Sequence, residues 1–547
     1  MWRQHLRNLA SGVALVVGVI YLVTSSASSP EKLQANARRA QPLPATSPID
    51  RFFEQTWARE KIATAKLADD LTILRRLSLS LHGTIPSLEE IRTFEADTAP
   101  DRLTRWTQRM LDDPRFSVYF AERLAKVYAG ADDKPFLVFR EDRFQNWIAE
   151  QLHNDRPYDQ WVNELISQTG LWTGKPSVNF ITAAANDSGI VDVNELTSRT
   201  TRAFLGQRID CAQCHDHPFA AWKQTDYQGL AAFYGDCHLS VFGVYDGEPT
   251  RREQRMMEMS SQDGEKHTTT PAVPFDPERL ASNGPDRTRL ADWITHPTNK
   301  RFHRATVNRV WGLLFGIAYS ELEPLKVAVD DLPDPPASPD DDLLEQLADN
   351  FRQNDYRLKS LILAITTSKA YRLSSETTLE DDEQIDRQGD WWARFPLSRL
   401  RPEQVIGAMA QSGSLSTIDQ NSHLVARLIR LIRERDFVRQ YGPITDEELA
   451  PHGATIPQAL LRMNGQMTSE LLEANPFNAS ARLTQLSPDN ETLIETAFLM
   501  TLTRRPTPRE QTWFNESLTH NPELKKEQLC QDLLWTLINS EEFNWNH

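Results

Sequence analysis

Cysteine is scarce in this sequence, which has only Cys211, Cys214, Cys237 and Cys530 among its 547 residues. Small secreted domains that depend on disulfides use far more cysteine, so a disulfide framework is excluded. An excess of basic residues is also missing, because 60 lysines and arginines stand against 76 acidic residues, for a net charge of −16. Nucleic-acid binding needs basic surface that neutralises phosphates, so nucleic acid is not expected as a partner.

The short motifs of several enzyme classes are absent as well. The sequence has no Gly-x-Ser-x-Gly nucleophile elbow, no glycine-rich phosphate loop and no His-Glu-x-x-His. No catalytic residue is therefore assigned, and the question of enzyme activity stays open. Tryptophan is plentiful, but Trp147, Trp161, Trp293 and Trp311 lie in helical apolar patterns and are predicted to belong to the core.

A mostly apolar run of fifteen residues occurs near the N-terminus, at 9–23. Basic residues precede it and small residues follow it, so residues 1–29 predict a signal peptide. The alternative is an uncleaved anchor, although the run is shorter than the ~20 residues that a helix needs to span hydrocarbon. Either route exports the protein to the periplasm or cell envelope. Membrane contact is expected only through residues 9–23, if they are retained.

The most informative feature of the sequence is Cys211-Ala212-Gln213-Cys214-His215. Cys-x-x-Cys-His is the attachment motif of c-type haem. In that interpretation the thiols of Cys211 and Cys214 form the two thioethers, and His215 is the proximal ligand of the haem iron. The motif predicts one haem c per chain. Export supports this prediction, since such haem is joined to protein outside the bacterial inner membrane.

The second axial ligand is not fixed by the sequence. The candidates are His238, His267, Met256, Met257 and Met259. A methionine would raise the reduction potential relative to a second histidine.

Two alternatives use the same residues without haem. A tetrahedral zinc site fits the ligand types and the spacing of Cys-x-x-Cys followed by further ligands. Its candidate ligands are Cys211, Cys214, His217, Cys237 and His238. The third alternative is a Cys211–Cys214 disulfide, which an oxidising compartment favours when no haem or metal takes the thiols.

The hydrophobic periodicity predicts a mainly α fold of two packed helical domains. Capping-box patterns mark helix starts at Ser87 with Glu90 and at Thr507 with Glu510. These starts align with each other and suggest a helix-pair repeat at both ends of the chain. A further helix is predicted to begin at Pro339, with Ser338 as its cap.

Composition changes along the chain divide it into five parts. They are a signal peptide or anchor at 1–29, a flexible tether at 30–50, a helical domain with the Cys-x-x-Cys-His motif at 51–242, a polar linker at 243–285 and a second helical domain at 286–547.

Several motifs together resemble a known pair of families. The first set consists of Thr200 to Gly206, Cys211 to Phe219, Trp222 and Asp226 to Phe233. These residues resemble the planctomycete cytochrome-type domain, which is formally of unknown function. The second set includes Leu290 to Trp293, Asn308 to Gly316, Leu343 to Ala348, Ser368 to Tyr371 and Leu533 to Phe543. It is similar to the uncharacterised domain that usually follows the first.

The resemblance implies an exported c-type-cytochrome-like protein with an electron-transfer or redox role at the cell envelope and a redox protein as partner. Many members of the family have an additional N-terminal cytochrome domain, which is missing here, so a single haem is implied. The second domain usually carries a Pro-Pro-Ser-His-Pro-like loop, which reads Pro335-Pro336-Ala337-Ser338-Pro339 in this sequence. The alternative function is a non-redox helical scaffold, with zinc or a disulfide at the cysteine motif, that engages another envelope protein or a polysaccharide.

Overall fold

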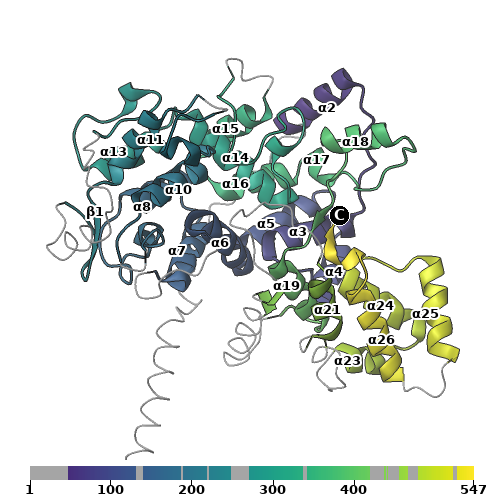
Figure 1. Ribbon diagram of the computed structural model, residues 1–547. Helices are drawn as coiled ribbons and strands as arrows, with labels where there is room; N and C mark the ends of the chain where they lie inside the picture. The colour runs from purple at the N-terminus through teal and green to yellow at the C-terminus, as the bar shows by residue number, and fades with distance from the viewer. Residues whose placement is uncertain are drawn as a thin grey trace, which may run out of the picture. The chain divides into compact units, whose positions relative to one another are not determined.

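The computed structural model describes residues 47–130, 139–186, 189–218, 221–247, 270–336, 342–418, 437–438, 440–441, 455–465, 468, 479–520 and 526–547. The predicted leader at 1–29, most of the predicted tether and the candidates Met256, Met257, Met259 and His267 lie outside these residues. Within them the fold is mainly α, as predicted (Figure 1).

The first part of the chain, up to the Cys-x-x-Cys-His motif and the helix after it, is helical. Its elements are α2 (Pro48–Glu60), α3 (Asp70–His82), α4 (Leu88–Ala96), α5 (Arg102–Asp112), α6 (Pro114–Ala129), α7 (Glu141–His153), α8 (Tyr158–Ser167), η2 (Pro176–Val178), α9 (Asn179–Thr182), α10 (Val193–Leu205), η3 (Asp210–Gln213), α11 (Gln224–Ala231) and η4 (Ala232–Tyr234). The predicted capping box of Ser87 and Glu90 is confirmed at the start of α4.

A short antiparallel hairpin follows, which the sequence did not predict. Its strands β1 (Cys237–Ser240) and β2 (Gly243–Asp246) pair His238 with Tyr245. The helices after it are η5 (Pro277–Arg279), α13 (Asp286–Ile294), α14 (Lys300–Phe315), η6 (Tyr319–Glu321), α15 (Leu343–Gln353), α16 (Leu358–Thr366), α17 (Lys369–Arg372) and α18 (Asp382–Asp390).

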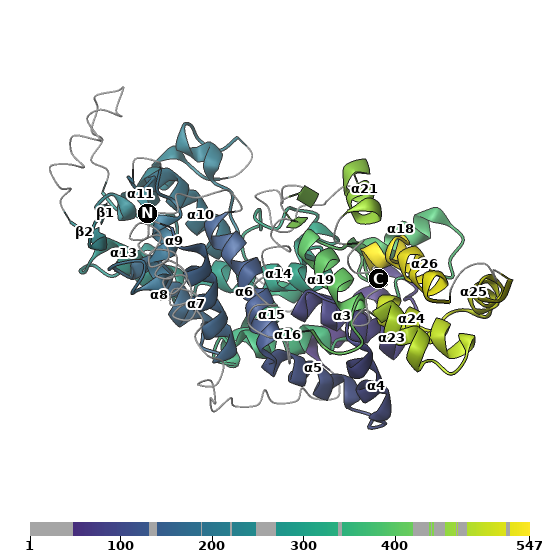
Figure 2. The same ribbon diagram turned by 90° about the horizontal axis from the view of Figure 1, so that it is seen from below.

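The last part of the chain contacts α3 and α4, near the start of the described residues. Its elements are β3 (Ser398–Arg399), α19 (Pro402–Ser412), α21 (Ile456–Asn464), α23 (Ala479–Leu486), α24 (Asn490–Leu502), α25 (Pro508–His520), α26 (Lys526–Ile538), η8 (Glu542–Asn544) and β4 (Trp545–Asn546). β3 pairs with β4, so the end of the chain is tied to the start of α19. Figures 1 and 2 both show α24 beside α4, from the opposite end of the sequence.

The buried apolar side chains form two clusters. The larger runs from Ile49 to Phe395 and also takes in Leu499, so it spans both predicted helical domains. The smaller joins Leu79 and Ile85 to residues between 400 and 543. The four tryptophans predicted to be core, Trp147, Trp161, Trp293 and Trp311, are all buried in the larger cluster, which confirms that prediction. Helix α14 is buried on almost every side, as expected for a helix at the centre of a core.

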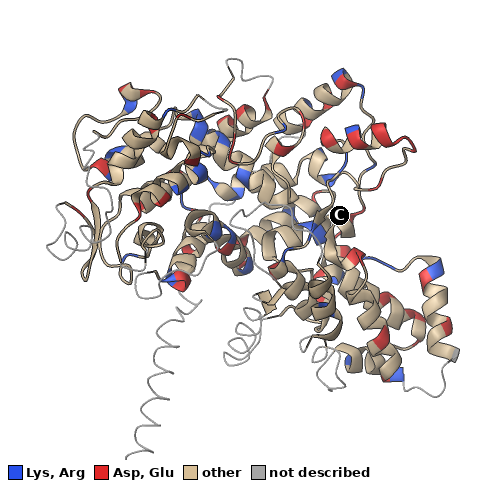
Figure 3. Cartoon of the chain, in the orientation of Figure 1, with Lys and Arg blue, Asp and Glu red and all other residues tan. Residues whose placement is uncertain are grey.

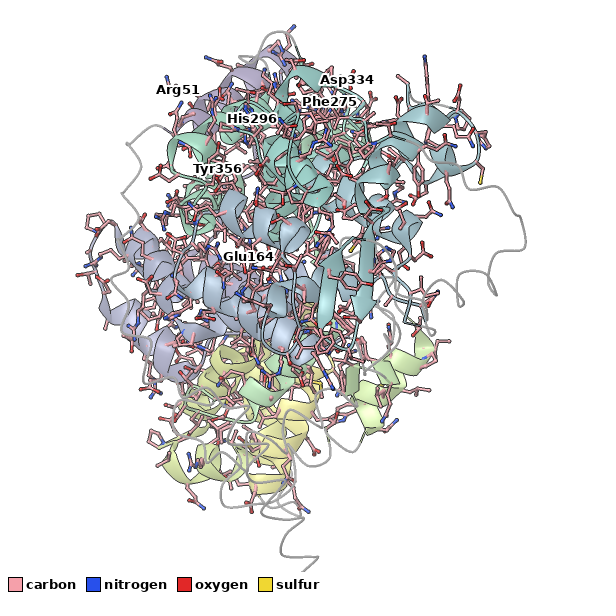
Figure 4. The ribbon with its side chains drawn as sticks, turned by 90° about the vertical axis from the view of Figure 1, so that its left-hand side faces the viewer. Arg51, Glu164, Phe275, His296, Asp334 and Tyr356 are labelled. Carbon is pink, nitrogen blue, oxygen red and sulfur yellow. The ribbon has the colours of Figure 1, made fainter. Side chains whose placement is uncertain are left out.

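The described part of the predicted polar linker packs against helices. Ala272 donates its backbone N–H to the carbonyl of Gly229 in α11 at 3.1 Å. The ring of Phe275 lies 4.5 Å from that of Trp293 in α13. Phe275 also lies near Asp334 (Figure 4), and Arg301 of α14 contacts both side chains. Residues 270–285 are thus held by elements on both sides of the linker, and the division into domains stays a prediction.

The prediction for the start of α15 is wrong in its position. The helix begins at Leu343, and the carboxylate of Asp342 accepts hydrogen bonds from the backbone N–H groups of Leu344 and Glu345. Ser338 and Pro339 lie outside the described residues. Asp342 also pairs with Arg304, at 2.8 Å, so a contact from α14 favours the later start.

Both signs of charge are spread over the described helices (Figure 3). Among the helices in the described ranges, none combines the length and the apolar character needed to cross a membrane.

Candidate functional site

The Cys-x-x-Cys-His motif lies between α10 and α11, where Cys211 belongs to a short 3-10 turn, η3, and Cys214 and His215 directly follow that turn. Helix α10 ends at Gly206, whose φ of +61° is the left-handed conformation that glycine adopts without strain. Ile209 and Ala212 are fully buried and fix the inner side of the turn in the larger apolar cluster.

Burying Ala212 turns the residues around it outward. Cys211, Cys214 and His215 are all exposed, and both cysteines are free thiols. All three groups of the motif are therefore accessible to solvent. This arrangement fits covalent haem, because a porphyrin can reach all three groups from solvent.

The imidazole of His215 has a defined orientation. Its Nδ1 lies 2.8 Å from the backbone carbonyl oxygen of Asp216, and because a carbonyl only accepts, Nδ1 carries the proton. The neutral ring then has its lone pair on Nε2. Histidines that bind metals are commonly held in this way, with the other ring nitrogen donating to a carbonyl or carboxylate.

Gln224, the first residue of α11, contacts the motif on both sides of His215. Its side-chain Nε2 donates to the carbonyl oxygens of Cys214 at 3.0 Å and Gln213 at 3.3 Å. Its backbone N–H donates to Oδ1 of Asp216 at 2.9 Å. Gln224 is not among the predicted site residues, and no sequence motif at this position signals its role.

The base of the motif loop is closed by Trp222. Its backbone carbonyl accepts from the N–H of His217 at 2.8 Å, and its indole donates to Oε1 of Gln207 at 2.9 Å. Gln207 in turn donates to the carbonyl of Leu332, in the loop after α14. The loop that carries the cysteines is thus attached to the core at both of its ends.

A buried tyrosine, Tyr227, lies in the helix that follows the motif. Tyr227 of α11 donates its hydroxyl to the carbonyl of Asn194 in α10 at 3.1 Å. Burial raises the pKa of Tyr227 to about 12, and the nearby negative charge of Asp210 acts in the same direction. The phenol therefore stays neutral at physiological pH.

Two of the remaining candidates lie in strand β1. Cys237 is 3% exposed and His238 is 5% exposed. Burial raises the pKa of the Cys237 thiol to about 11, which disfavours the thiolate that a metal requires. The ring of His238 lies 5.7 Å from that of Tyr245.

The five residues of the alternative zinc set are not gathered into one cluster. Throughout the described ranges, no group of three or more histidine, cysteine or acidic side chains is placed to hold a metal ion. Cys211 and Cys214, which the third alternative would join, are free thiols in this structure.

Two family models match the chain. Residues 48–238, which include the motif, match PSCyt2, described as a protein of unknown function (DUF1549). Residues 286–431 match PSD1, also described as a protein of unknown function (DUF1553). Comparisons with curated proteins and with solved structures gave no match. The two matches confirm the predicted succession of two family domains, and the chain carries these two domains of unknown function in this order.

Proposed function

We propose that this chain is an exported c-type-cytochrome-like protein that carries one covalently attached haem and transfers electrons to or from a redox partner at the cell envelope. The single observation that carries the proposal is the exposure of Cys211, Cys214 and His215 in the loop between α10 and α11, with Nδ1 of His215 bonded to a carbonyl.

The attachment step follows from the two free thiols. Each of Cys211 and Cys214 adds its S–H across one vinyl group of haem, so that sulfur bonds to one vinyl carbon and the proton goes to the other. No electrons are gained or lost overall, and no leaving group is released. The haem, once bound, supplies an iron centre that changes oxidation state by one electron.

The chain's own residues position and tune that centre. His215 would offer Nε2 as the proximal ligand, and its bond to the carbonyl of Asp216 fixes the orientation of the ring. A second ligand, if the iron takes one, would come from His238, His267, Met256, Met257 or Met259. Of these, His238 lies in the described part of the chain, where its Nε2 is buried without a hydrogen-bond partner.

Haem content tests the proposal directly. The protein is exported from a host with c-type maturation machinery and analysed by pyridine haemochrome spectrum and intact mass. We expect one haem per chain, lost in the Cys211→Ala/Cys214→Ala double variant and retained in Cys237→Ala, which removes a thiol outside the motif. His215→Ala should keep the covalent mass but lose the low-spin spectrum. An unmodified mass with no visible absorbance would contradict the proposal, and zinc analysis of that protein would then test the scaffold alternative.

A further inference from the structure

The orientation of His215 depends on a bond within its own turn. The acceptor for Nδ1 is the carbonyl of Asp216, the next residue along the chain. A bond to a neighbouring peptide fixes the ring only if that peptide is itself held. The turn is exposed and short, so something outside it must hold the backbone on both sides of His215.

Gln224 holds both sides at once. On the upstream side, its Nε2 donates to the carbonyls of Gln213, the last residue of η3, and of Cys214, which follows it. On the downstream side, its backbone N–H holds the carboxylate of Asp216. Gln224 therefore holds the peptide group before His215 and the side chain of the residue after it. The peptide that carries the acceptor carbonyl of Asp216 is held in addition by the bond from the N–H of His217 to the carbonyl of Trp222.

The position of Gln224 at the start of α11 gives it the rigidity that this role needs. The helix is anchored by the buried Tyr227 and Leu230, and its first turn is closed by the carboxylate of Asp226, which accepts from the N–H of Lys223 at 2.9 Å. The Asp216 carboxylate complements the positive end of the same helix. These contacts fix the backbone from which the Gln224 side chain extends.

We propose that Gln224 is the positioning residue for the His215 imidazole, holding it in the tautomer with the proton on Nδ1 and the lone pair on Nε2. This inference rests on the proposed function for its purpose, since a free Nε2 is what a proximal haem ligand requires. Its structural content concerns the polypeptide alone and is measurable without haem.

The decisive variant is Gln224→Glu, which keeps the shape of the side chain but replaces its N–H donors with a carboxylate facing two carbonyl oxygens. Gln228→Glu is the matched control, because it adds the same charge one turn further along α11. The readout is the imidazole ¹⁵N chemical shifts of haem-free protein labelled on histidine, at about pH 8.5, two units above the usual histidine pKa. The signals of His215 are assigned from their loss in His215→Gln.

We expect the wild type and Gln228→Glu to show His215 in the Nδ1–H tautomer. Gln224→Glu should show a mixture of the two tautomers. Equal tautomer populations in all three proteins would overturn the inference. If Gln224→Glu does not fold, Gln224→Ala removes the same donors without adding charge and is expected to give the same mixture.

A second measurement on the loaded protein separates this inference from the proposed function. Gln224→Glu should retain the haem content of the wild type, because both thiols remain, but with a shifted midpoint potential that Gln228→Glu does not show. A tautomer change in a protein that never acquires haem would uphold the role of Gln224 and contradict the cytochrome proposal. Full haem content with an unchanged tautomer and an unchanged midpoint potential would uphold the cytochrome proposal and contradict the role of Gln224.

Discussion

Arg75 of α3 donates from Nη2 to the backbone carbonyl oxygen of Phe543 at 3.2 Å, although 468 positions separate the two residues in sequence. The same guanidinium donates from Nη1 to the carbonyl of Thr501 at 3.1 Å. Arg75 is fully buried, and burial lowers its pKa to about 10, so it stays charged at neutral pH. A buried cation thus joins the N-terminal part of the fold to the helices at its end.

Replacing Arg75 should loosen the C-terminal helices first. Arg75→Met keeps most of the side-chain volume but leaves the carbonyls of Thr501 and Phe543 without their donor, at a cost of roughly 2–4 kcal/mol. Hydrogen exchange followed by mass spectrometry should show that Arg75→Met accelerates exchange, relative to the wild type, more in α24 and α26 than in α14. The exposed Arg92 on α4 provides the control, and Arg92→Met should change neither exchange nor the unfolding midpoint. Uniformly faster exchange across all helices would contradict a local role.

Two buried histidines should make the fold sensitive to mild acid. Burial lowers the pKa of His82 to about 4, and the neighbouring Arg115 adds to the effect. Burial likewise lowers the pKa of His303 to about 4, with a contribution from Arg352. The unfolded chain, with histidine pKa values near the usual 6.5, then binds more protons than the folded chain between about pH 6.5 and 4. Stability is therefore present above this window and falls as pH drops through it.

Each histidine contributes on the order of 3 kcal/mol to the loss of folding stability at low pH, from the difference between its pKa values in the folded and unfolded chain. His82→Gln keeps an N–H donor for the carbonyl of Met110, which His82 Nε2 contacts at 3.1 Å, and should flatten the decline of the urea midpoint between pH 6.5 and 4. The half-buried His296 outside the core is the comparison, and His296→Gln should leave the decline unchanged. An unaltered decline in His82→Gln would show that His82 titrates normally.

A partly buried lysine pairs with two carboxylates, one on its own helix and one on α19. Lys126 of α6 lies 3.1 Å from Oε1 of Glu122 and also pairs with Glu403. Burial alone would raise the pKa of Glu403, but the charges of Lys126 and Arg401 outweigh it and lower the pKa to about 2. Glu403 therefore stabilises the fold above its unfolded pKa, near 4.5, and this contribution is lost as pH falls from there towards 2.

Lys126→Met should destabilise the protein by roughly 2 kcal/mol at pH 7, since it leaves a buried carboxylate without its nearest cation. The effect should shrink as pH falls from about 4.5 towards 2, the range in which the wild type loses the contribution of Glu403. Adding Glu403→Gln to Lys126→Met removes the uncompensated charge and should recover part of the loss at pH 7. Urea unfolding of both variants measures this, with the exposed Lys66→Met as the control. A destabilisation that does not change with pH would mean that packing rather than charge is responsible.

Local signals in the sequence predicted much of the fold. The capping box at Ser87 is present, and at Thr507 the Glu510 carboxylate accepts from the backbone N–H at 2.7 Å. The aligned ends share one further feature, because each capping glutamate pairs with an arginine. Glu90 pairs with Arg115 in the first, and Glu510 pairs with Arg504 in the second, where Arg504 also binds Glu542. The repeat itself stays a prediction.

Contacts between distant segments account for what the sequence did not predict. Strand β1 is only four residues long, and its turn is formed by the exposed apolar residues Val241 and Phe242, which are not turn formers, so the hairpin gave no signal. The spacing of Cys211, Cys214 and Cys237 suits zinc, yet the strand buries Cys237 while the turn exposes the other two. The role of Gln224 arises only when the motif loop folds back onto the start of α11.

The glycine before the motif should be required for both stability and haem attachment. At Gly206, a Cβ atom would lie 3.0 Å from Cδ1 of Leu332 and 3.1 Å from the Cβ of Ala305, in addition to the unfavourable φ of +61°. Gly189 has a similar φ of +74° but nothing within 4 Å of the added atom, so Gly189→Ala measures the cost of the backbone conformation alone. Gly206→Ala should be less stable than Gly189→Ala by about 1–3 kcal/mol, the usual cost of overpacking a core.

The close contact that a Cβ atom at residue 206 would make with Leu332 also affects the motif loop. Leu332 supplies the carbonyl that holds Gln207, and Gln207 holds the indole of Trp222 at the base of the motif loop. Displacing Leu332 therefore displaces the loop that presents Cys211, Cys214 and His215. Urea unfolding compares the stabilities, and the haemochrome assay should show less haem per folded chain in Gly206→Ala than in Gly189→Ala. Equal stability and equal haem content in the two variants would mean that Leu332 moves aside without effect on the loop, and that the motif does not depend on this contact.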